Sequence, residues 1–255
     1  GWVEHDPLEI LQTVKSTISI IFERNNIIQN DIVSCGITNQ RETIVAWDKV
    51  TGKPLYNAIV WQDRRTHEIC KNLVDKNYTN FIQEKTGLII DPYFSASKIQ
   101  WLLENINDQQ NLIIGTIDTW IIWNLTNKAK HVTDITNASR TMLYNITTEI
   151  WDDELLKLFN IRKSILPTVL SNKDEYGTIH FEHFGIEIPI GGVVGDQQSA
   201  SLGQLCLKKG MIKATYGTGC FVLINTDKNK ITSKNKLLTT VASKIDKKKQ
   251  YAVEG

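Results

Sequence analysis

Three short polar segments hold the side chains best suited to chemistry, and each directly follows an apolar run. One contains the adjacent pair Arg41 and Glu42, the next contains Trp61, and the last contains Asp196. The segments cover residues 36–43, 59–66 and 192–198. Because ligands bind at the ends of strands in α/β sheets, these segments are candidates for a small-molecule site.

The residue types fit an uncharged molecule that carries several hydroxyls. Arg41 offers donors in fixed geometry and the neighbouring Glu42 offers only acceptors; an exposed ion pair explains these two residues equally well. Trp61 could form an apolar wall for ligand carbons, although the protein core is the commoner place for tryptophan. Asp196 could act in acid–base or metal chemistry, although a carboxylate that caps the following helix is the commoner meaning of this pattern.

A fourth segment contains Gly217, Thr218 and a second glycine in sequence. Small residues let backbone N–H groups approach a phosphate, and Thr218 adds a hydroxyl. A plain hairpin turn is the alternative interpretation. Neither a Walker A motif nor G-x-G-x-x-G occurs in the sequence.

Composition excludes several classes of protein. The 255 residues include 29 Lys and Arg against 28 Asp and Glu, so the formal net charge of +1 gives no electrostatic basis for nucleic-acid binding. The four cysteines form no C-x-x-C motif, which predicts free thiols and a cytoplasmic location. The longest apolar run is broken by Asp118, so we expect no membrane span.

Periodicity predicts an α/β fold in which strands alternate with helices. Helices are expected over residues 7–23, 66–74, 97–105, 112–125, 151–159 and 197–207. Strands are expected over residues 31–38, 43–48, 58–61, 188–194, 211–216 and 220–225, the second and third as an antiparallel hairpin.

Residues 93–105 (YFSASKIQWLLEN) resemble the N-terminal signature of the FGGY carbohydrate kinases. Five further blocks resemble the members of that family that phosphorylate glycerol. They are GITNQRET (36–43), YNAIVWQ (56–62), TNASRT (136–141), GDQQ (195–198) and TYGTGCF (215–221).

This resemblance implies two ribonuclease H-like domains with mixed sheets, as in the ATPases related to actin and hexokinase, and an active site between them. Residues 1–203 would be the substrate-binding domain without its first strands, and residues 204–255 the beginning of the nucleotide-binding domain. The family's Asp-x-Gly-Thr phosphate hairpin precedes the block that opens this sequence. We therefore expect catalysis by the parent protein and none by these 255 residues alone.

The implied reaction moves the γ-phosphoryl group of ATP to glycerol, with Mg²⁺, in a cytoplasmic homodimer. The residues that would hydrogen-bond the glycerol hydroxyls are Arg41, Glu42, Tyr93, Asp196 and Gln197. Trp61 and Phe221 would contact its carbons, Asp196 would be the catalytic base, and Gly217 and Thr218 would contact nucleotide phosphate. The resemblance identifies no metal ligand. A kinase for another small polyol or a pentulose, or a non-catalytic polyol-binding scaffold, is the alternative.

Overall fold

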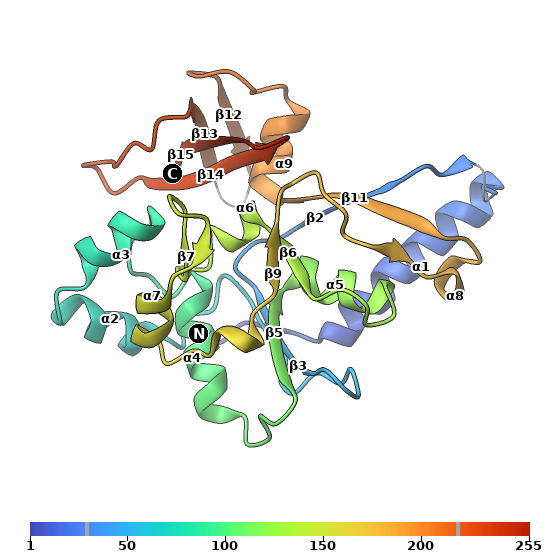
Figure 1. The fold of residues 1–255 in the computed structure, drawn as a ribbon, viewed down its shortest axis with the longest axis horizontal. Helices are drawn as coiled ribbons and strands as arrows, with labels where there is room; N and C mark the ends of the chain where they lie inside the picture. The colour runs from blue at the N-terminus through green and yellow to red at the C-terminus, as the bar shows by residue number, and fades with distance from the viewer. Residues whose placement is uncertain (29–30, 218–219) are drawn as a thin grey trace.

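A computed structural model describes residues 1–28, 31–217 and 220–255, which form an α/β fold (Figure 1). The helices are α1 (Pro7–Asn25), α2 (His67–Asp75), α3 (Thr79–Thr86), α4 (Ser95–Asn105), α5 (Ile117–Leu125), α6 (Ile135–Ala138), α7 (Asp153–Leu158), α8 (Phe181–Phe184) and α9 (Asp196–Gly203), with a 3-10 turn at Lys163–Ile165. The strands up to the middle of the chain are β1 (Glu4–His5), β2 (Cys35–Asn39), β3 (Ile44–Asp48), β4 (Ala58–Ile59), β5 (Leu112–Thr116), β6 (Val132–Asp134) and β7 (Tyr144–Asn145). The later strands are β8 (Ile150–Trp151), β9 (Thr168–Leu170), β10 (Thr178–Ile179), β11 (Ile188–Gly195), β12 (Ile212–Tyr216), β13 (Cys220–Asp227), β14 (Leu238–Ile245) and β15 (Lys248–Glu254).

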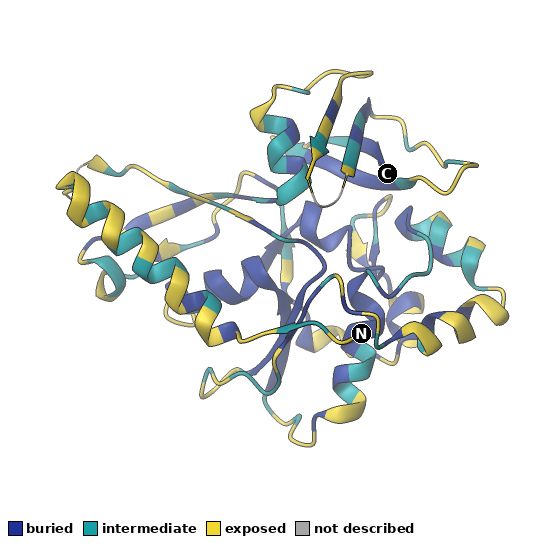
Figure 2. Cartoon of the chain, turned by 180° about the vertical axis from the view of Figure 1, so that it is seen from behind, coloured by how far each residue is buried: buried dark blue, intermediate teal, exposed yellow. Residues whose placement is uncertain are grey.

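The central antiparallel sheet has the order β1-β4-β3-β5 and separates two hydrophobic cores. Successive side chains of a strand point to opposite faces, so Ile44 and Ala46 of β3 enter one core while Val45 and Trp47 enter the other. Helix α1 lies outside this layer, with exposed residues along its outer surface (Figure 2). Strands β3, β4 and β5 are therefore buried on both faces of the sheet.

A second sheet, of order β10-β11-β2, brings two of the polar segments together. Strands β2 and β11 are parallel, and Gly195 at the end of β11 pairs with Asn39 at the end of β2. The residues that follow the two strands must therefore emerge at the same sheet edge. This register explains how side chains more than 150 positions apart, such as Arg41 and Gln198, come into contact.

The last four strands form an antiparallel sheet of order β12-β13-β15-β14, the upper layer in Figure 1. Strand β14 packs on α6 and donates from Thr239 N to Gly87 O at 2.9 Å. Gly87 has φ +75°, and a Cβ there would lie 2.3 Å from Thr239 O. Glycine is needed at this position because both the backbone angle and the close approach of β14 exclude a side chain.

Several elements confirm the sequence predictions, but the strand predicted over residues 31–38 begins only at Cys35, the helix predicted over residues 197–207 ends at Gly203, and one further prediction fails in part. Helix α1 begins after Asp6, whose carboxylate accepts from Leu8 N, and β3 pairs with β4 as an antiparallel hairpin. The helix predicted over residues 112–125 is wrong in its first part, because residues 112–116 form β5 against β3. A continuous apolar run cannot distinguish a strand buried on both faces from a buried helix.

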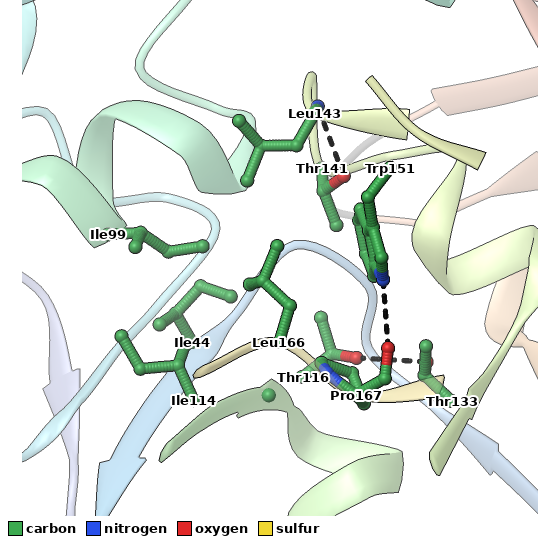
Figure 3. Close-up of a pocket in the computed structure, with 11 residues that line it drawn as sticks. Ile44, Ile99, Ile114, Thr116, Thr133, Thr141, Leu143, Trp151, Leu166 and Pro167 are labelled. Atoms are coloured by element: carbon green, nitrogen blue, oxygen red, sulfur yellow. Dashed lines mark hydrogen bonds between the residues drawn. The ribbon is translucent and has the colours of Figure 1, made fainter. Parts of the chain in front are cut away.

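A small void lies in the core that contains Ile44 and Ala46, between β3, β5 and α4 (Figure 3). Its volume is about 10 Å³, barely room for one water molecule. Polar groups beside it are bonded, since Trp151 Nε1 donates to Pro167 O at 2.8 Å and Leu143 N donates to Thr141 Oγ1 at 3.2 Å. It is therefore a packing void and not a ligand site.

Candidate active site

The main candidate site is a cavity of about 50 Å³ at the edge where β2 and β11 end. Its lining residues are Arg41, Glu42, Trp61, Tyr93, Asp196, Gln197 and Phe221. The structure thus brings together all seven residues assigned to the substrate, although their roles remain predictions. Gly217 is exposed and does not line this cavity, and Thr218 falls outside the described residues.

Asp196 is the first residue of α9, and its side chain is 44% exposed. The helix N-cap is Gly195, so Asp196 is not the N-cap residue, although its Oδ1 accepts from Gln197 N in the first turn at 2.7 Å. A Cβ at Gly195 would lie 2.7 Å from Cδ of Arg41, so glycine lets the arginine pass close to the end of β11. Arg41 Nε then lies 3.1 Å from Asp196 Oδ1, but too poorly aligned for a hydrogen bond.

Arg41 and Glu42 belong to a buried cluster of four charges, so their interpretation as an exposed pair is also wrong. Arg140 Nε donates to Glu42 Oε1 at 2.6 Å, and its Nη1 lies 3.3 Å from Glu254 Oε2. Arg41 holds the same Glu254 through both Nη atoms, with Nη1 at 2.9 Å from Oε2. We call Arg41, Glu42, Arg140 and Glu254 the charged cluster; none is more than 2% exposed.

Within the charged cluster, burial and ion pairing shift the pKa values of the two glutamates in opposite directions. Burial raises the pKa of Glu42 above its usual range, despite the two arginines. Burial acts the same way on Glu254, but attraction to Arg140 and Arg41 outweighs it and lowers its pKa to about 2. Burial also raises the pKa of Tyr93 to about 12. At neutral pH Glu254 is thus a fixed anion, and Tyr93 keeps its hydroxyl proton for donation.

Aromatic rings form the apolar side of the cavity. The centroid of Trp61 lies 5.5 Å from that of Tyr93 and 6.4 Å from that of Phe221, both edge to face. Buried Lys98 on α4 fixes the segment that carries Tyr93, because its ammonium donates to the carbonyls of Pro92, Tyr93 and Phe94. Trp61 is only half-buried, which fits a wall that contacts a ligand better than a core residue.

A second polar network joins the ends of β2 and β11 and contains no arginine or lysine. Asp134 accepts from Thr136 N at 2.6 Å, Asn137 Nδ2 at 2.7 Å and Asn172 Nδ2 at 2.7 Å. Asn137 also donates to Asn39 Oδ1 at 2.9 Å, and Thr136 Oγ1 accepts from Gly195 N at 2.9 Å. We call these residues, with Asp118, the amide network. It fixes the ends of β2 and β11, from which Arg41 and Asp196 project.

Sequence analysis did not identify the residues that bind the side chains of Arg41 and Glu42. Arg140 and Gln198 lie in the quoted blocks but received no role, and Glu254 was not considered. Gln198 Oε1 accepts from Arg41 Nη1 at 3.1 Å. A signal for Arg140 was available, since an arginine amid small polar residues, TNASRT, requires a counter-charge if it is buried.

The described residues do not form a magnesium site by themselves. Within residues 1–28, 31–217 and 220–255, no three His, Cys, Asp or Glu side chains are grouped so that they could hold a metal ion. Mg²⁺ is usually bound by one or two carboxylates together with substrate phosphates. Asp196 is the most exposed carboxylate of the cavity, and it faces Arg41. We therefore assign no step to a metal held by these residues.

Comparison with known proteins identifies the family. Residues 1–203 match the model for the N-terminal domain of the FGGY family of carbohydrate kinases. The chain belongs to this family. The chain is 54% identical over 261 residues to a glycerol kinase of Petrotoga mobilis, and this match covers 100% of this chain and 52% of the relative. It is 54% identical over 266 residues to a glycerol kinase of Mycoplasmoides gallisepticum, with the same coverage. The chain thus spans about half the length of the curated relatives it matches.

Solved structures confirm the FGGY fold. The chain matches a crystal structure of Plasmodium falciparum glycerol kinase with ADP, with a TM-score of 0.94 and 44% identity, over 100% of this chain and 53% of that chain. A ligand-bound xylulose kinase from Lactobacillus acidophilus gives a TM-score of 0.84 at 24% identity, and the match covers 100% of this chain and 51% of that chain. The second match supports the fold alone. No helix in the described part of the chain has the length and apolar character to cross a membrane.

Proposed function

We propose that the protein to which this chain belongs transfers the γ-phosphoryl group of ATP to a terminal hydroxyl of glycerol. The observation that carries this proposal is the cavity itself. It combines a buried arginine and glutamate, a half-exposed aspartate and an aromatic wall, in a chain about half identical to glycerol kinases. A triol requires this combination because it presents hydroxyls on one side and carbon atoms on the other.

The size of the cavity supports a small substrate. One water molecule needs about 10–15 Å³ of such space, so the 50 Å³ beside Asp196 holds only a few non-hydrogen atoms. A three-carbon triol therefore fits better than a pentulose. Hydroxyl recognition can be strict, because a substrate that lacked one hydroxyl would leave buried polar groups such as Arg41 Nε without a partner.

Asp196 is proposed as the catalytic base. Its carboxylate takes the proton of the terminal hydroxyl while the oxygen forms a bond to the γ-phosphorus and the bond from that phosphorus to the bridging oxygen of ADP breaks. The electron pair of the broken bond leaves with ADP. Gly217 and Thr218 are proposed to contact the phosphates, and Mg²⁺ enters only as the ion carried by ATP.

The remaining parts of the proposal concern organisation. We propose a substrate-binding domain over residues 1–203 and the beginning of a nucleotide-binding domain over residues 204–255. This division is supported by the end of α9 at Gly203 and by the separate sheet that begins with β12. A homodimer and a cytoplasmic location complete the proposal.

The substrate is tested by measuring ADP release from the full-length protein with a panel of polyols and pentuloses. Glycerol should give the highest kcat/KM. A higher value with a pentulose would replace the substrate assignment. Glycerol binding with no ADP release for any substrate would favour the non-catalytic scaffold.

The role of Asp196 is tested by Asp196→Asn in the same protein. Removing a general base should lower kcat about 10²–10⁴-fold, while glycerol binding measured by calorimetry persists. Asp153→Asn is the matched control, because that carboxylate is 79% exposed and far from the cavity lining. Near-normal turnover of Asp196→Asn would exclude Asp196 as the base.

A further inference from the structure

We propose that Glu254, on β15, is a positioning residue for substrate binding: by binding both Nη atoms of Arg41, it fixes the plane of the guanidinium beside the cavity, with Nε next to Asp196. This inference rests on the proposed function, since it assigns Arg41 to the substrate. Glu254 does not line the cavity, so it acts indirectly, and Arg41 is the cavity residue to which it is hydrogen-bonded.

The geometry supports this role directly. Glu254 binds both terminal nitrogens of Arg41, one through each carboxylate oxygen, and this arrangement fixes the plane of the guanidinium. Arg140 Nη1 lies 3.3 Å from Oε2 of the same carboxylate and so limits its rotation. Gln198 occupies the other hydrogen of Arg41 Nη1 at 3.1 Å. Arg41 Nε is left next to Asp196 Oδ1 at 3.1 Å, and it has no aligned hydrogen-bond partner within the described part of the chain.

The charges show what Glu254 prevents. Two arginines and two glutamates balance within the charged cluster, and Asp196 is a further carboxylate whose Oδ1 already lies 3.1 Å from Arg41 Nε. Without the Glu254 charge, the two buried arginines would have only Glu42 and the half-exposed Asp196 as counter-charges. Arg41 would then rotate to align its donors on Asp196, because a buried cation requires a counter-charge. The same movement would withdraw a donor from the substrate and tie up the proposed base.

A second ion pair of the same sheet offers a matched comparison. Glu149 pairs with Lys244 of β14 and Lys249 of β15, the latter at 3.0 Å. It joins the C-terminal sheet to the rest of the chain, as Glu254 does, but it lies outside the substrate cavity. If Glu254 served only to hold the two parts together, Glu149→Gln would reproduce its effects.

The test compares Glu254→Gln, Glu254→Asp and Glu149→Gln in the full-length protein, with calorimetric glycerol binding and steady-state kinetics. We expect Glu254→Gln to weaken glycerol binding at least tenfold and Glu254→Asp to restore part of the loss. Glu149→Gln should lower the melting temperature while glycerol affinity stays within about twofold. If Glu254→Gln does not fold, Glu254→Asp alone decides, with at least threefold weaker binding expected because its carboxylate is drawn back from Arg41.

A double-mutant cycle separates positioning from general stability. In an Arg41→Gln background, Glu254→Gln should weaken glycerol binding no further. Additive losses, or glycerol binding by Glu254→Asp equal to that of the wild type, would overturn the inference. If the wild-type protein neither binds nor phosphorylates glycerol, the proposed function fails instead, and that result is distinguishable because it precedes any substitution.

Discussion

The charged cluster and the amide network both hold residues at or next to the ends of β2 and β11, but they satisfy buried polar groups in opposite ways. The cluster balances two arginines against two glutamates. The network surrounds Asp134 with backbone, hydroxyl and amide donors and uses no cation. A charge pair leaves residual charge and donors that can face a substrate, whereas an amide network uses its donors internally. The first is suited to recognition and the second to holding strand ends in place.

The largest effect should come from breaking the charge balance. Arg140→Met leaves Glu42 and Glu254 to share Arg41, and loss of one partner from a buried ion pair costs about 3–5 kcal/mol of unfolding free energy. Urea denaturation measures the change. Exposed Arg162→Met should alter stability little, and an equal loss in both variants would contradict this view of the cluster.

A smaller loss is expected from the amide network. Asp134→Asn replaces one carboxylate oxygen by a donor that faces other donors, so at least one buried hydrogen bond is lost, at about 1–3 kcal/mol. The same denaturation experiment applies. Asp246→Asn serves as control, because Asp246 is 73% exposed. If Asp134→Asn lost more unfolding free energy than Arg140→Met, the amide network would contribute more to stability than the charged cluster.

The two regions should also respond to different pH ranges. Burial and the charge of Asp118 raise the pKa of Asp134 from 3.8 to about 7, so the folded state binds the proton more tightly and its stability falls as pH rises from 4 to 7. Glu254 has a lowered pKa of about 2, so its contribution is present above pH 4.5 and is lost as pH falls toward 2. Each proton contributes at most about 1.4 kcal/mol per pH unit.

Urea midpoints measured across pH separate these contributions. Asp134→Asn should flatten the profile between pH 4 and 7, and Glu254→Gln should flatten it below pH 4.5. If Asp134→Asn flattened the profile only below pH 4.5 and Glu254→Gln flattened it only between pH 4 and 7, the assignment of the two pH ranges would be refuted.

The smallest effect on stability is expected from an exposed ion pair. Lys163 and Asp153 form an ion pair at 3.2 Å with side chains 54% and 79% exposed. Water screens such pairs, so Lys163→Ala should change the unfolding free energy by less than about 0.5 kcal/mol. A larger change in urea denaturation would mean that exposure does not separate weak from strong ion pairs in this protein.

Sequence patterns predicted the parts of the site that depend on neighbours in the chain. Arg41 beside Glu42, and Asp196 at the end of a strand, could be found from local order. Their burial could not, because it depends on β2 and β11 lying in parallel register. Glu254 could not be found, because its partner Arg41 is 213 positions away. The division of residues 112–125 into β5 and α5 likewise depends on pairing with β3.

The position of Glu254 has a consequence for the making of the protein. A ribosome that adds about 5–20 residues per second needs about 10–40 s to proceed from Arg41 to Glu254, 213 residues later. During that interval the nascent chain carries two arginines, Arg41 and Arg140, that will later pair with the same carboxylate. The emerging chain must keep this region hydrated until β15 arrives, so the charged cluster can close only after that strand has been made.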